Sequence, residues 1–365
     1  MRAAVFYEYN APLRIDDITL DKPKRGEVLV KVAASGVCHS DLSVMNGTLP
    51  FPPPPAILGH EGAGVVQEIG DGVTAVQPGD HVILSWRPSC GRCSYCVTGR
   101  PQLCQTIGMA LLQGYLPDGT TRFHKGETEI RIFTGVGSFA EYTVVPEAGV
   151  VKIRKDVPLD AAALVGCGVM TGVGAVINTA KVEAGSSVAV IGCGGVGLNV
   201  IQGAVLAGAE KIIAIDLNPK KLELAKQFGA THCVNPADGD PVTQVLRLTD
   251  GLGAEYAFEV IGRADTAVQA YNSIRPGGTA VVVGVAKPDD MMMISALSLL
   301  QEKTLKGSIY GSARPSVDMP KLLDLYMSKK LKLDELITRR IKLDQINEAF
   351  QWMEKGEVAR SVIVY

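Results

Sequence analysis

One segment constrains the fold of this chain more than any other, because an apolar strand, a glycine-rich turn and an amphipathic helix follow one another without interruption. The strand SVAVIG begins at Ser187, the turn and helix CGGVGLNVIQGAVLAG follow, and a second apolar strand, KIIAID, ends at Asp216. Two more apolar strands, AEYAFEVI and TAVVVGV, come later with helical segments between them. This alternation predicts an α/β domain, a doubly wound parallel sheet with helices on both faces.

The turn at residues 192–197 has the pattern G-x-G-x-x-G and opens the helix. Glycine allows the tight turn, the approach of the backbone to a pyrophosphate and close packing of helix on strand, and the helix N-terminus favours an anion. Asp216 lies 19 residues beyond the last of these glycines, where a carboxylate binds the ribose hydroxyls and repels a 2′-phosphate. We therefore expect NAD rather than NADP, with Lys221 assisting; the glycines involved are Gly192, Gly194, Gly195 and Gly197. The alternatives are a turn without a nucleotide and an ordinary exposed lysine.

The chain on both sides of this segment has a different character. Before it, the strands VLVKVAASGV, AGVVQEIG and DHVILSW are separated by Gly, Pro and Asp turns, which predicts an antiparallel, barrel-like β domain. After it, the helical segments PKLLDLYMSKK and INEAFQWMEKGE precede a last strand, SVIVY, which we expect to return to the first domain. A chain of 365 residues is expected to form two domains. Our bounds are 1–165 with 306–365 for the β-rich domain and 166–305 for the parallel-sheet domain.

Composition excludes several classes of protein. Hydrophobic residues make up 47% and charged residues 20% of the chain, as in a globular protein, and the formal net charge is -2 without a long run of Lys or Arg. We therefore expect no nucleic-acid partner and no membrane-surface patch. No apolar run approaches the roughly 20 residues that span a bilayer, and MRAAVFYEYN lacks the pattern of a secretory signal. A soluble cytoplasmic protein is expected.

Four of the eight cysteines form a cluster with the spacing C-x2-C-x2-C-x7-C. They are Cys90, Cys93, Cys96 and Cys104. In a long chain without an export signal, clustered cysteines favour metal binding over disulfides, and four thiolates around one zinc ion make a closed, structural site. An iron–sulfur cluster fits less well, because a ferredoxin run has a shorter last gap and a proline where this chain has Gln105. A nucleic-acid-binding zinc module would need more positive charge than three arginines supply, Arg87, Arg92 and Arg100.

Two further cysteines and a histidine are scattered along the chain: Cys38 in VCHSDL, His60 in GHEGAG and Cys167 in GCGVMTG. Two cysteines and one histidine form the ligand set of an open catalytic zinc site, which leaves a coordination position for water or alcohol. Spacing alone does not bring residues this far apart together. A buried structural cysteine and a hydrogen-bonded histidine are the alternatives.

In their order along the chain, these segments resemble the zinc-dependent, medium-chain alcohol dehydrogenase family, and the resemblance runs essentially from end to end. It rests on GHEGAGVVQEIGDGV, the four-cysteine lobe, GCGVMTGVGA, the GCGGVG turn with Asp216, and FEVIGR at residues 258–263. It implies a GroES-like, β-rich catalytic domain beside a Rossmann domain, with NAD and two zinc ions, one catalytic and one structural. A zinc-free quinone reductase of the same superfamily would lack both cysteine sets.

The resemblance also implies roles for residues around the catalytic zinc. The ligands would be Cys38, His60 and Cys167. The metal would act as a Lewis acid on the alcohol oxygen while the alcohol gives a hydride to the nicotinamide. Ser40 would pass on the proton of the alcohol, Asp41 would orient the histidine ligand, and Glu61 would approach the metal during ligand exchange. A simple turn at Ser40 and Asp41, and an ion pair between Glu61 and a distant arginine, are the alternatives.

For the cofactor, the resemblance implies that His39 and Arg360 contact the pyrophosphate and that Thr171 and Val196 pack on the nicotinamide. Further residues of this site would be Val260, Val283 and Val285. The cleft between the two domains would hold NAD and zinc. Nucleotide-binding domains of the family commonly pair through their edge strands, so we expect a homodimer, with a tetramer as the alternative.

The substrate pocket implied by the resemblance is apolar and consists of Trp86, Leu103, Met109 and Val285. Such a pocket suits primary alcohols, aromatic and allylic ones among them, unless Trp86 is simply part of the core. Ser43 stands where some members end their proton relay with a histidine, and Gly108 where the glutathione-dependent formaldehyde enzymes carry an arginine for the glutathione carboxylate. We therefore place oxidation of S-(hydroxymethyl)glutathione second, and a nucleotide- and zinc-binding protein without catalysis third.

Overall fold

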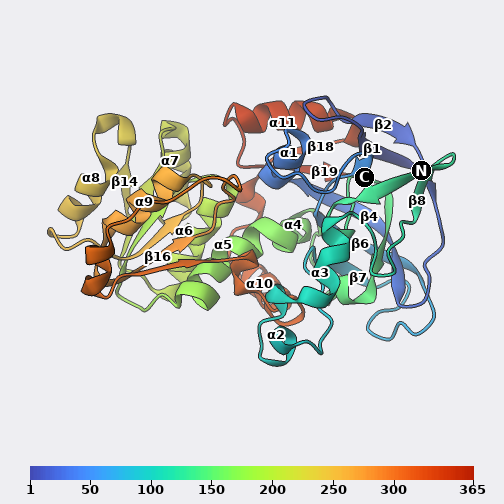
Figure 1. The fold of residues 1–365 in the computed structure, drawn as a ribbon, viewed down its shortest axis with the longest axis horizontal. Coiled ribbons are helices and arrows are strands. Elements are labelled where there is room, and N and C mark those ends of the chain that lie inside the picture. Colours follow the sequence, from blue (N-terminus) through green and yellow to red (C-terminus); the bar gives the residue numbers. More distant parts are fainter. The chain divides into compact units, whose positions relative to one another are not determined.

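Figure 1 follows the chain through two compact units, Met1–Gly168 together with Arg314–Tyr365, and Val169–Ala313. The computed structural model describes residues 1–106 and 111–365. The bounds of the two domains that we expect from the sequence stay a prediction, because the two compact units are defined by contacts and not by those bounds.

The first unit is built on two sheets whose strands run mostly antiparallel. One sheet has the order β2-β1-β5-β9-β8-β3. Its strands are β1 (Arg2–Phe6), β2 (Arg14–Asp17), β3 (Thr19–Leu20), β5 (Ala56–Ile57), β8 (Phe123–Lys125) and β9 (Thr128–Ile132). The other has the order β11-β7-β6-β4-β19-β18, with β10 also paired to β4. Its strands are β4 (Glu27–Val37), β6 (Glu61–Ile69), β7 (His81–Leu84), β10 (Tyr142–Pro146), β11 (Val150–Ile153), β18 (Ile337–Ile341) and β19 (Arg360–Val364).

The long strand β4 organises the second sheet, because it pairs antiparallel with β6, β10 and β19. Its β-branched side chains Val28 and Val30 are fully buried and pack with Val66 and Val82 of β6 and β7, as suits a pleated, buried face. The three strands predicted in this part of the chain are confirmed as β4, β6 and β7, and so is the barrel-like β architecture. The last strand of the chain, β19, lies directly beside β4.

Short helices connect the strands of the first unit. The α-helices are α1 (His39–Met45), α2 (Ser94–Val97), α3 (Gln105–Leu112), α4 (Leu159–Leu164), α10 (Pro315–Met327) and α11 (Ile346–Glu354). Single 3-10 turns are η1 (Pro101–Leu103), η2 (Phe133–Gly135), η3 (Glu147–Gly149), η9 (Asp334–Leu336) and η10 (Leu343–Gln345). Helix α10 begins before the segment predicted from Pro320, because Pro315 occupies its first turn, where the missing N–H costs nothing. Helix α11 buries Ile346, Ala349 and Phe350, one face of a helical repeat.

A continuous helical stretch, Leu159–Ala180, corrects one prediction. It comprises α4, the π-helix η4 (Val165–Val169), α5 (Met170–Gly174) and the π-helix η5 (Ala175–Ala180). By its length of 22 residues and its mean hydropathy of 1.7 it could cross a membrane, so the expectation that no apolar run is long enough was wrong. Because 83% of this apolar stretch is buried, it has the character of a core helix.

The second unit contains a six-stranded parallel sheet with the order β14-β13-β12-β15-β16-β17. Its strands are β12 (Ser187–Ile191), β13 (Lys211–Ile215), β14 (His232–Val234), β15 (Ala254–Glu259), β16 (Ile274–Val282) and β17 (Thr304–Gly307). The chain order reverses between β12 and β15, which is the topological switch point where open parallel sheets bind ligands. The predicted doubly wound parallel sheet is therefore confirmed.

Helices pack on this sheet in two groups (Figure 1). The α-helices that follow its strands are α6 (Gly195–Ala207), α7 (Pro219–Gln227), α8 (Pro241–Leu248) and α9 (Ala264–Ser273), with 3-10 turns at η6 (Pro236–Asp238), η7 (Ala296–Gln301) and η8 (Tyr310–Ser312). Helix α6 packs on β12 and β13 next to α5, whereas α9 packs on β15 and β16 next to α8. Buried Ile191, Ile213 and Tyr271 belong to the core beneath them.

Candidate metal centres and cofactor site

Strand pairing brings three separate parts of the chain to one end of β4. Gly36 of β4 lies opposite Glu61, and Val37 lies opposite Ser361. Cys38, which follows β4, is therefore placed between the start of β6 and the start of β19. The turn that carries His60 enters β6 at the same end.

The predicted zinc ligands Cys38, His60 and Cys167 form one buried group. Their ligand atoms, together with a carboxylate oxygen of Glu61, all lie within 4.8 Å of one another. The Nε2 atom of His60 is buried without a hydrogen-bond partner among the described residues. An imidazole nitrogen in this environment, next to two cysteine sulfurs, is suited to bind a zinc ion, because zinc prefers nitrogen and sulfur ligands. The predicted grouping is confirmed.

The carboxylate of Asp41 holds this group in place from behind. Its Oδ1 atom lies 3.1 Å from Nδ1 of His60 and accepts a hydrogen bond of 3.0 Å from the Gly59 amide. Its Oδ2 atom accepts a hydrogen bond of 3.2 Å from the Cys38 amide. Because the side chain is fully buried, both oxygens depend on these partners. These contacts fix the position of the His60 ring, and the role of Asp41 in orienting a zinc ligand stays a prediction.

The charges of the group favour a thiolate ligand. A hydrogen bond with Cys167 lowers the pKa of Cys38 well below its ordinary value, against the effect of burial, and the charge of His60 acts in the same direction. Burial lowers the pKa of His60, but Asp41 and Cys38 outweigh it and raise this pKa to about 10. Because a metal ion binds only the neutral imidazole, metal binding at this group is linked to the protonation of His60.

Glu61 and Arg360 form a buried ion pair beside the zinc ligands. The second carboxylate oxygen of Glu61 accepts a hydrogen bond of 3.0 Å from the Gly168 amide, next to Cys167. Glu61 therefore lies beside the candidate zinc ligands and is at the same time the ion-pair partner of a distant arginine. Because Arg360 pairs with Glu61 here, its contact with a pyrophosphate stays a prediction.

Polar and aromatic side chains surround the ligands. Oγ of Ser40 lies 3.9 Å from the Cys38 sulfur, which puts a hydroxyl next to the metal group. Ser43 is buried, whereas His39 is exposed. The ring centroid of Trp86 lies 6.4 Å from that of His60, so this predicted pocket residue is close to a zinc ligand. The functions of Ser40 and His39 stay predictions.

Phe133 was missed by the sequence analysis. Its ring centroid lies 5.3 Å from that of His60, edge to face. The residue is buried in η2, a single turn for which the sequence carries no periodic signal. Of the other expected pocket residues, Leu103 is half-buried on η1 and Met109 lies outside the described residues.

The four clustered cysteines converge as predicted for a structural zinc. Their sulfur atoms lie within 4.8 Å of one another, and the Cys90 amide and the Cys93 amide each donate to a sulfur of the cluster at 3.4 Å. The side-chain hydrogen bond between Cys90 and Thr106, with help from backbone amides, lowers the pKa of Cys90 to about 5. Burial has the opposite effect on Cys96 and raises its pKa to about 12. Amide donors around clustered thiolates fit a bound divalent metal.

The glycine-rich turn joins β12 to α6 at the carboxyl end of the parallel sheet. A Cβ atom at Gly197 would overlap the carbonyl oxygen of Gly192, so this close packing of helix on strand requires glycine. Nothing lies within 4 Å of a Cβ placed at Gly194, which leaves open space above the start of the helix. Gly194, Gly195 and Val196 are all half-buried. A turn with free space at a helix N-terminus fits a dinucleotide pyrophosphate.

Asp216 ends β13 beside this turn. Its Oδ2 atom accepts a hydrogen bond of 2.9 Å from the Cys193 amide, and its Oδ1 atom accepts one of 2.8 Å from the Asn218 amide. The charge of Lys221 acts on the Cys193 thiol, so this lysine lies near the turn. The remaining cofactor residues expected here are half-buried or exposed: Thr171, Val260 and Val283 are half-buried, and Val285 is 52% exposed. Their contacts with a cofactor stay predictions.

Two family models match the chain. A model described as "Alcohol dehydrogenase GroES-like domain" matches residues 24–155, and one described as "Zinc-binding dehydrogenase" matches residues 195–328. The first match includes Cys38, His60 and the four clustered cysteines, but it ends before Cys167. The second match begins inside the glycine-rich turn.

Characterised proteins resemble the chain over its full length. It is 45% identical to an "Alcohol dehydrogenase class-3" of Cereibacter sphaeroides, with 100% of this chain and 99% of that one covered. It is 43% identical to an "S-(hydroxymethyl)glutathione dehydrogenase" of Paracoccus denitrificans, with the same coverage. The crystal structure of benzyl alcohol dehydrogenase from Acinetobacter calcoaceticus is similar with a TM-score of 0.94 and 36% identity, covering 100% of this chain and 98% of that one.

Proposed function

Because the chain belongs to the zinc-dependent, medium-chain alcohol dehydrogenase family, we propose that it catalyses the reversible, NAD-linked oxidation of a CH2–OH group, either to the thioester of a thiol adduct or to the aldehyde of a free primary alcohol. The observation that carries this proposal is the buried group of Cys38, His60 and Cys167. Three protein ligands leave one position of a tetrahedral zinc ion for a substrate, as in catalytic sites, whereas the four-cysteine cluster leaves none.

The residues around the ligands prepare this site for loss of a proton from the substrate. When bound, zinc supplies a Lewis acid that lowers the pKa of a hydroxyl on its open position. Asp41 fixes the ring of His60, and two thiolates with a neutral histidine balance the charge of a divalent cation. Arg360 balances the charge of Glu61. The site therefore carries no excess negative charge that would oppose formation of an alkoxide.

Ser40 is the residue to which we assign the first step of proton release. Its half-buried hydroxyl lies beside Cys38, so it can accept the proton of a substrate hydroxyl and pass it on. Ser43 is not a base at neutral pH, so the path from Ser40 to solvent needs water or the ribose hydroxyls of the cofactor.

We assign the choice of cofactor to Asp216. Its carboxylate follows β13 and is held by two backbone amides beside the glycine-rich turn. A fixed negative charge at this position accepts hydrogen bonds from ribose hydroxyls and repels a 2′-phosphate, which supports NAD over NADP.

For the substrate, we give first place to S-(hydroxymethyl)glutathione. The end-to-end similarity to a dehydrogenase of that name supports this thiol adduct more strongly than the free primary alcohols that the sequence analysis placed first. Free aromatic alcohols are the second candidate. They are favoured by Gly108, which supplies no cation for a glutathione carboxylate, and by the similarity to a benzyl alcohol dehydrogenase.

The test is a comparison of kcat/KM for S-(hydroxymethyl)glutathione and for benzyl alcohol, with NAD and the same zinc-loaded preparation. A higher value for the adduct supports the first candidate, and a higher value for benzyl alcohol assigns the free alcohols instead. Gly108→Arg is the matched variant: it adds a cation, so it should raise the value for the adduct and leave that for benzyl alcohol nearly unchanged. Absence of NADH formation with every alcohol would contradict catalysis itself.

We also propose that the chain forms a homodimer through the edge of its parallel sheet. Just before the edge strand β17, four large apolar side chains are 74% to 89% exposed: Met291, Met293, Leu297 and Leu300. Exposed apolar side chains gathered in one segment favour association with another chain. Light scattering should give a dimer for the wild type and a smaller species for Met293→Glu with Leu300→Glu. A cytoplasmic location and the absence of nucleic-acid partners stay predictions.

A further inference from the structure

Glu259 at the end of β15 is a fully buried carboxylate for which the proposed reaction has no use. Four donors converge on its Oε1 atom: the amides of Ile261, Gly262 and Arg263 at 2.9, 2.7 and 3.4 Å, and the Thr266 hydroxyl at 2.8 Å. Its Oε2 atom is buried without a hydrogen-bond partner in the described part of the chain. A buried carboxylate without a paired cation is costly, so its presence calls for a reason.

The loop that Glu259 holds is packed against the loop that follows β16. Gly262 has a φ of +92°, and a Cβ atom there would overlap the carbonyl oxygen of Val285. A Cβ atom at Gly284 would overlap the amide of Gly262. The main-chain carbonyl of Glu259 also accepts hydrogen bonds from the Val283 amide at 2.9 Å and the Gly284 amide at 3.1 Å. The side chain of Glu259 thus holds one loop and its main chain holds the other.

The first loop is also joined to the strand that leads into the glycine-rich turn. The Val260 amide donates a hydrogen bond of 2.9 Å to the carbonyl of Ile191, the last residue of β12. Residues 260–263 therefore lie between the glycine-rich turn and residues 283–285, at the carboxyl ends of β12, β15 and β16. This edge, at the switch point of the sheet, is where open parallel sheets bind ligands.

We propose that Glu259 is a positioning residue for the dinucleotide: through one oxygen it fixes residues 260–263 as a wall of the cofactor site. This inference rests on the proposed dinucleotide-linked function. Charge-assisted hydrogen bonds to a carboxylate are stronger than neutral ones, so a single oxygen can hold three consecutive amides. A loop held in this way keeps its shape before the cofactor arrives, and binding then costs less ordering of the chain.

The test compares variants of Glu259 by their dissociation constant for NADH, measured by fluorescence titration. Glu259→Met removes the acceptor at similar size and should weaken NADH binding about tenfold, since the loss of a hydrogen bond to a charged group corresponds to a change of about that size. Glu259→Gln keeps one acceptor oxygen without the charge and should restore binding to within about threefold of the wild type. Thr266→Val removes a single donor at the half-buried edge of the network, and it serves as a milder variant if Glu259→Met does not fold. It should weaken NADH binding about twofold to threefold.

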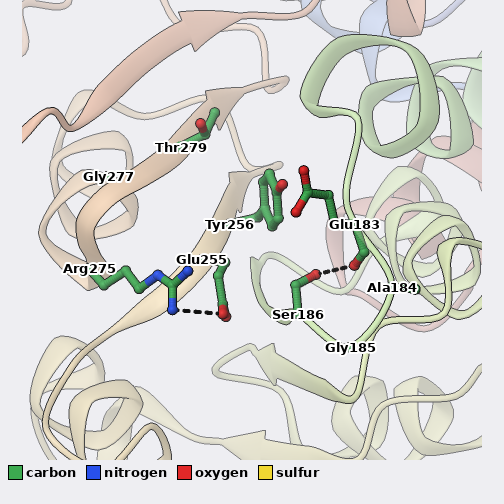
Figure 2. Close-up of a pocket in the computed structure, with 9 residues that line it drawn as sticks. All are labelled: Glu183, Ala184, Gly185, Ser186, Glu255, Tyr256, Arg275, Gly277 and Thr279. Atoms are coloured by element: carbon green, nitrogen blue, oxygen red, sulfur yellow. Dashed lines mark hydrogen bonds and ion pairs between the residues drawn. The ribbon is translucent and has the colours of Figure 1, made fainter.

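Glu255 provides the matched control, because it lies near the start of β15, the strand that ends at Glu259. Figure 2 shows its side chain next to that of Arg275. Its carboxylate also accepts a backbone hydrogen bond, from the Ser187 amide at 2.7 Å, and it forms an ion pair of 2.9 Å with Arg275. Glu255→Met should reduce stability while leaving the dissociation constant for NADH unchanged.

Amide hydrogen exchange without cofactor is the second measurement. Glu259→Met should speed exchange at residues 260–263 and 283–285, and Glu255→Met should not. Equal weakening of NADH binding by both methionine variants, or wild-type binding in both Glu259→Met and Thr266→Val, would overturn the inference. A wild-type protein that binds no NADH would instead contradict the proposed function, so the two failures are distinguishable.

Discussion

Asp41→Asn tests the link between the buried hydrogen bonds and the catalytic zinc. Both carboxylate oxygens of Asp41 accept from N–H groups, Oδ1 from Gly59 and His60 and Oδ2 from Cys38. Asparagine has only one acceptor oxygen, so its NH2 group must face at least one N–H donor. A buried donor left unsatisfied costs about 1–3 kcal/mol. This cost corresponds to a decrease in zinc affinity by a factor of about 5 to 150. The range overlaps the roughly 10- to 100-fold losses of affinity that are typical when the hydrogen-bond partner of a metal ligand is removed.

The assay is competition with a chromophoric chelator at fixed pH, which reports the affinity of the more labile of the two zinc ions. Asp80→Asn is the matched control in the same unit, because Asp80 is also buried and accepts a hydrogen bond of 3.0 Å from the Gln77 amide, but belongs to neither group of metal ligands. We expect the control to retain wild-type zinc affinity. Unchanged affinity in Asp41→Asn, or an equal loss in Asp80→Asn, would refute the reasoning.

Four further substitutions test the two metal groups, the cofactor site and a buried ion pair. Cys38→Ser should abolish turnover and leave the thermal unfolding midpoint nearly unchanged, whereas Cys93→Ser should mainly lower that midpoint; equal effects on folding would contradict the separate assignments. Asp216→Gly should reduce the preference for NAD over NADP in kcat/KM, and an unchanged preference would mean that the carboxylate does not contact the ribose. Arg122→Met should lower the free energy of unfolding by about 3–5 kcal/mol in urea denaturation. The reason is that the substitution leaves buried Glu27, whose carboxylate lies 2.9 Å from the guanidinium in the wild type, without this partner. A loss below about 1 kcal/mol would exclude this ion pair as a major contribution to stability.

The features that could be predicted from the sequence are those whose cause is local. The turn at residues 192–197 needs glycine at fixed offsets between a strand and a helix, and the four clustered cysteines lie close enough along the chain to meet without long-range folding. For Cys38, His60 and Cys167 the residue types and the family resemblance of the surrounding motifs were informative, whereas their spacing was not. Their meeting depends on the pairing of β4 with β6 and on the π-helix η4, neither of which has a sequence signal.

The features that were missed depend on contacts between distant segments. An ion pair between Glu61 and a distant arginine was named only as an alternative, and its partner, Arg360, was not identified. The two residues are 299 positions apart and meet because β19 lies beside β4. The stretch Leu159–Ala180 contains four glycines, which interrupt the apolar pattern and hide one continuous helix. Tertiary packing overrides the low helix propensity of glycine there, since most of the stretch is buried. Phe133 lies in a single turn, where no periodicity exists to reveal it.

The most direct test of the central claim is a count of zinc together with activity and folding. We predict two zinc ions per chain. A chelator should remove one of them first, with loss of NAD-linked alcohol oxidation and little change in circular dichroism, and added zinc should restore the activity. A fully active protein with one zinc ion per chain, or loss of the fold together with the first zinc, would contradict this claim.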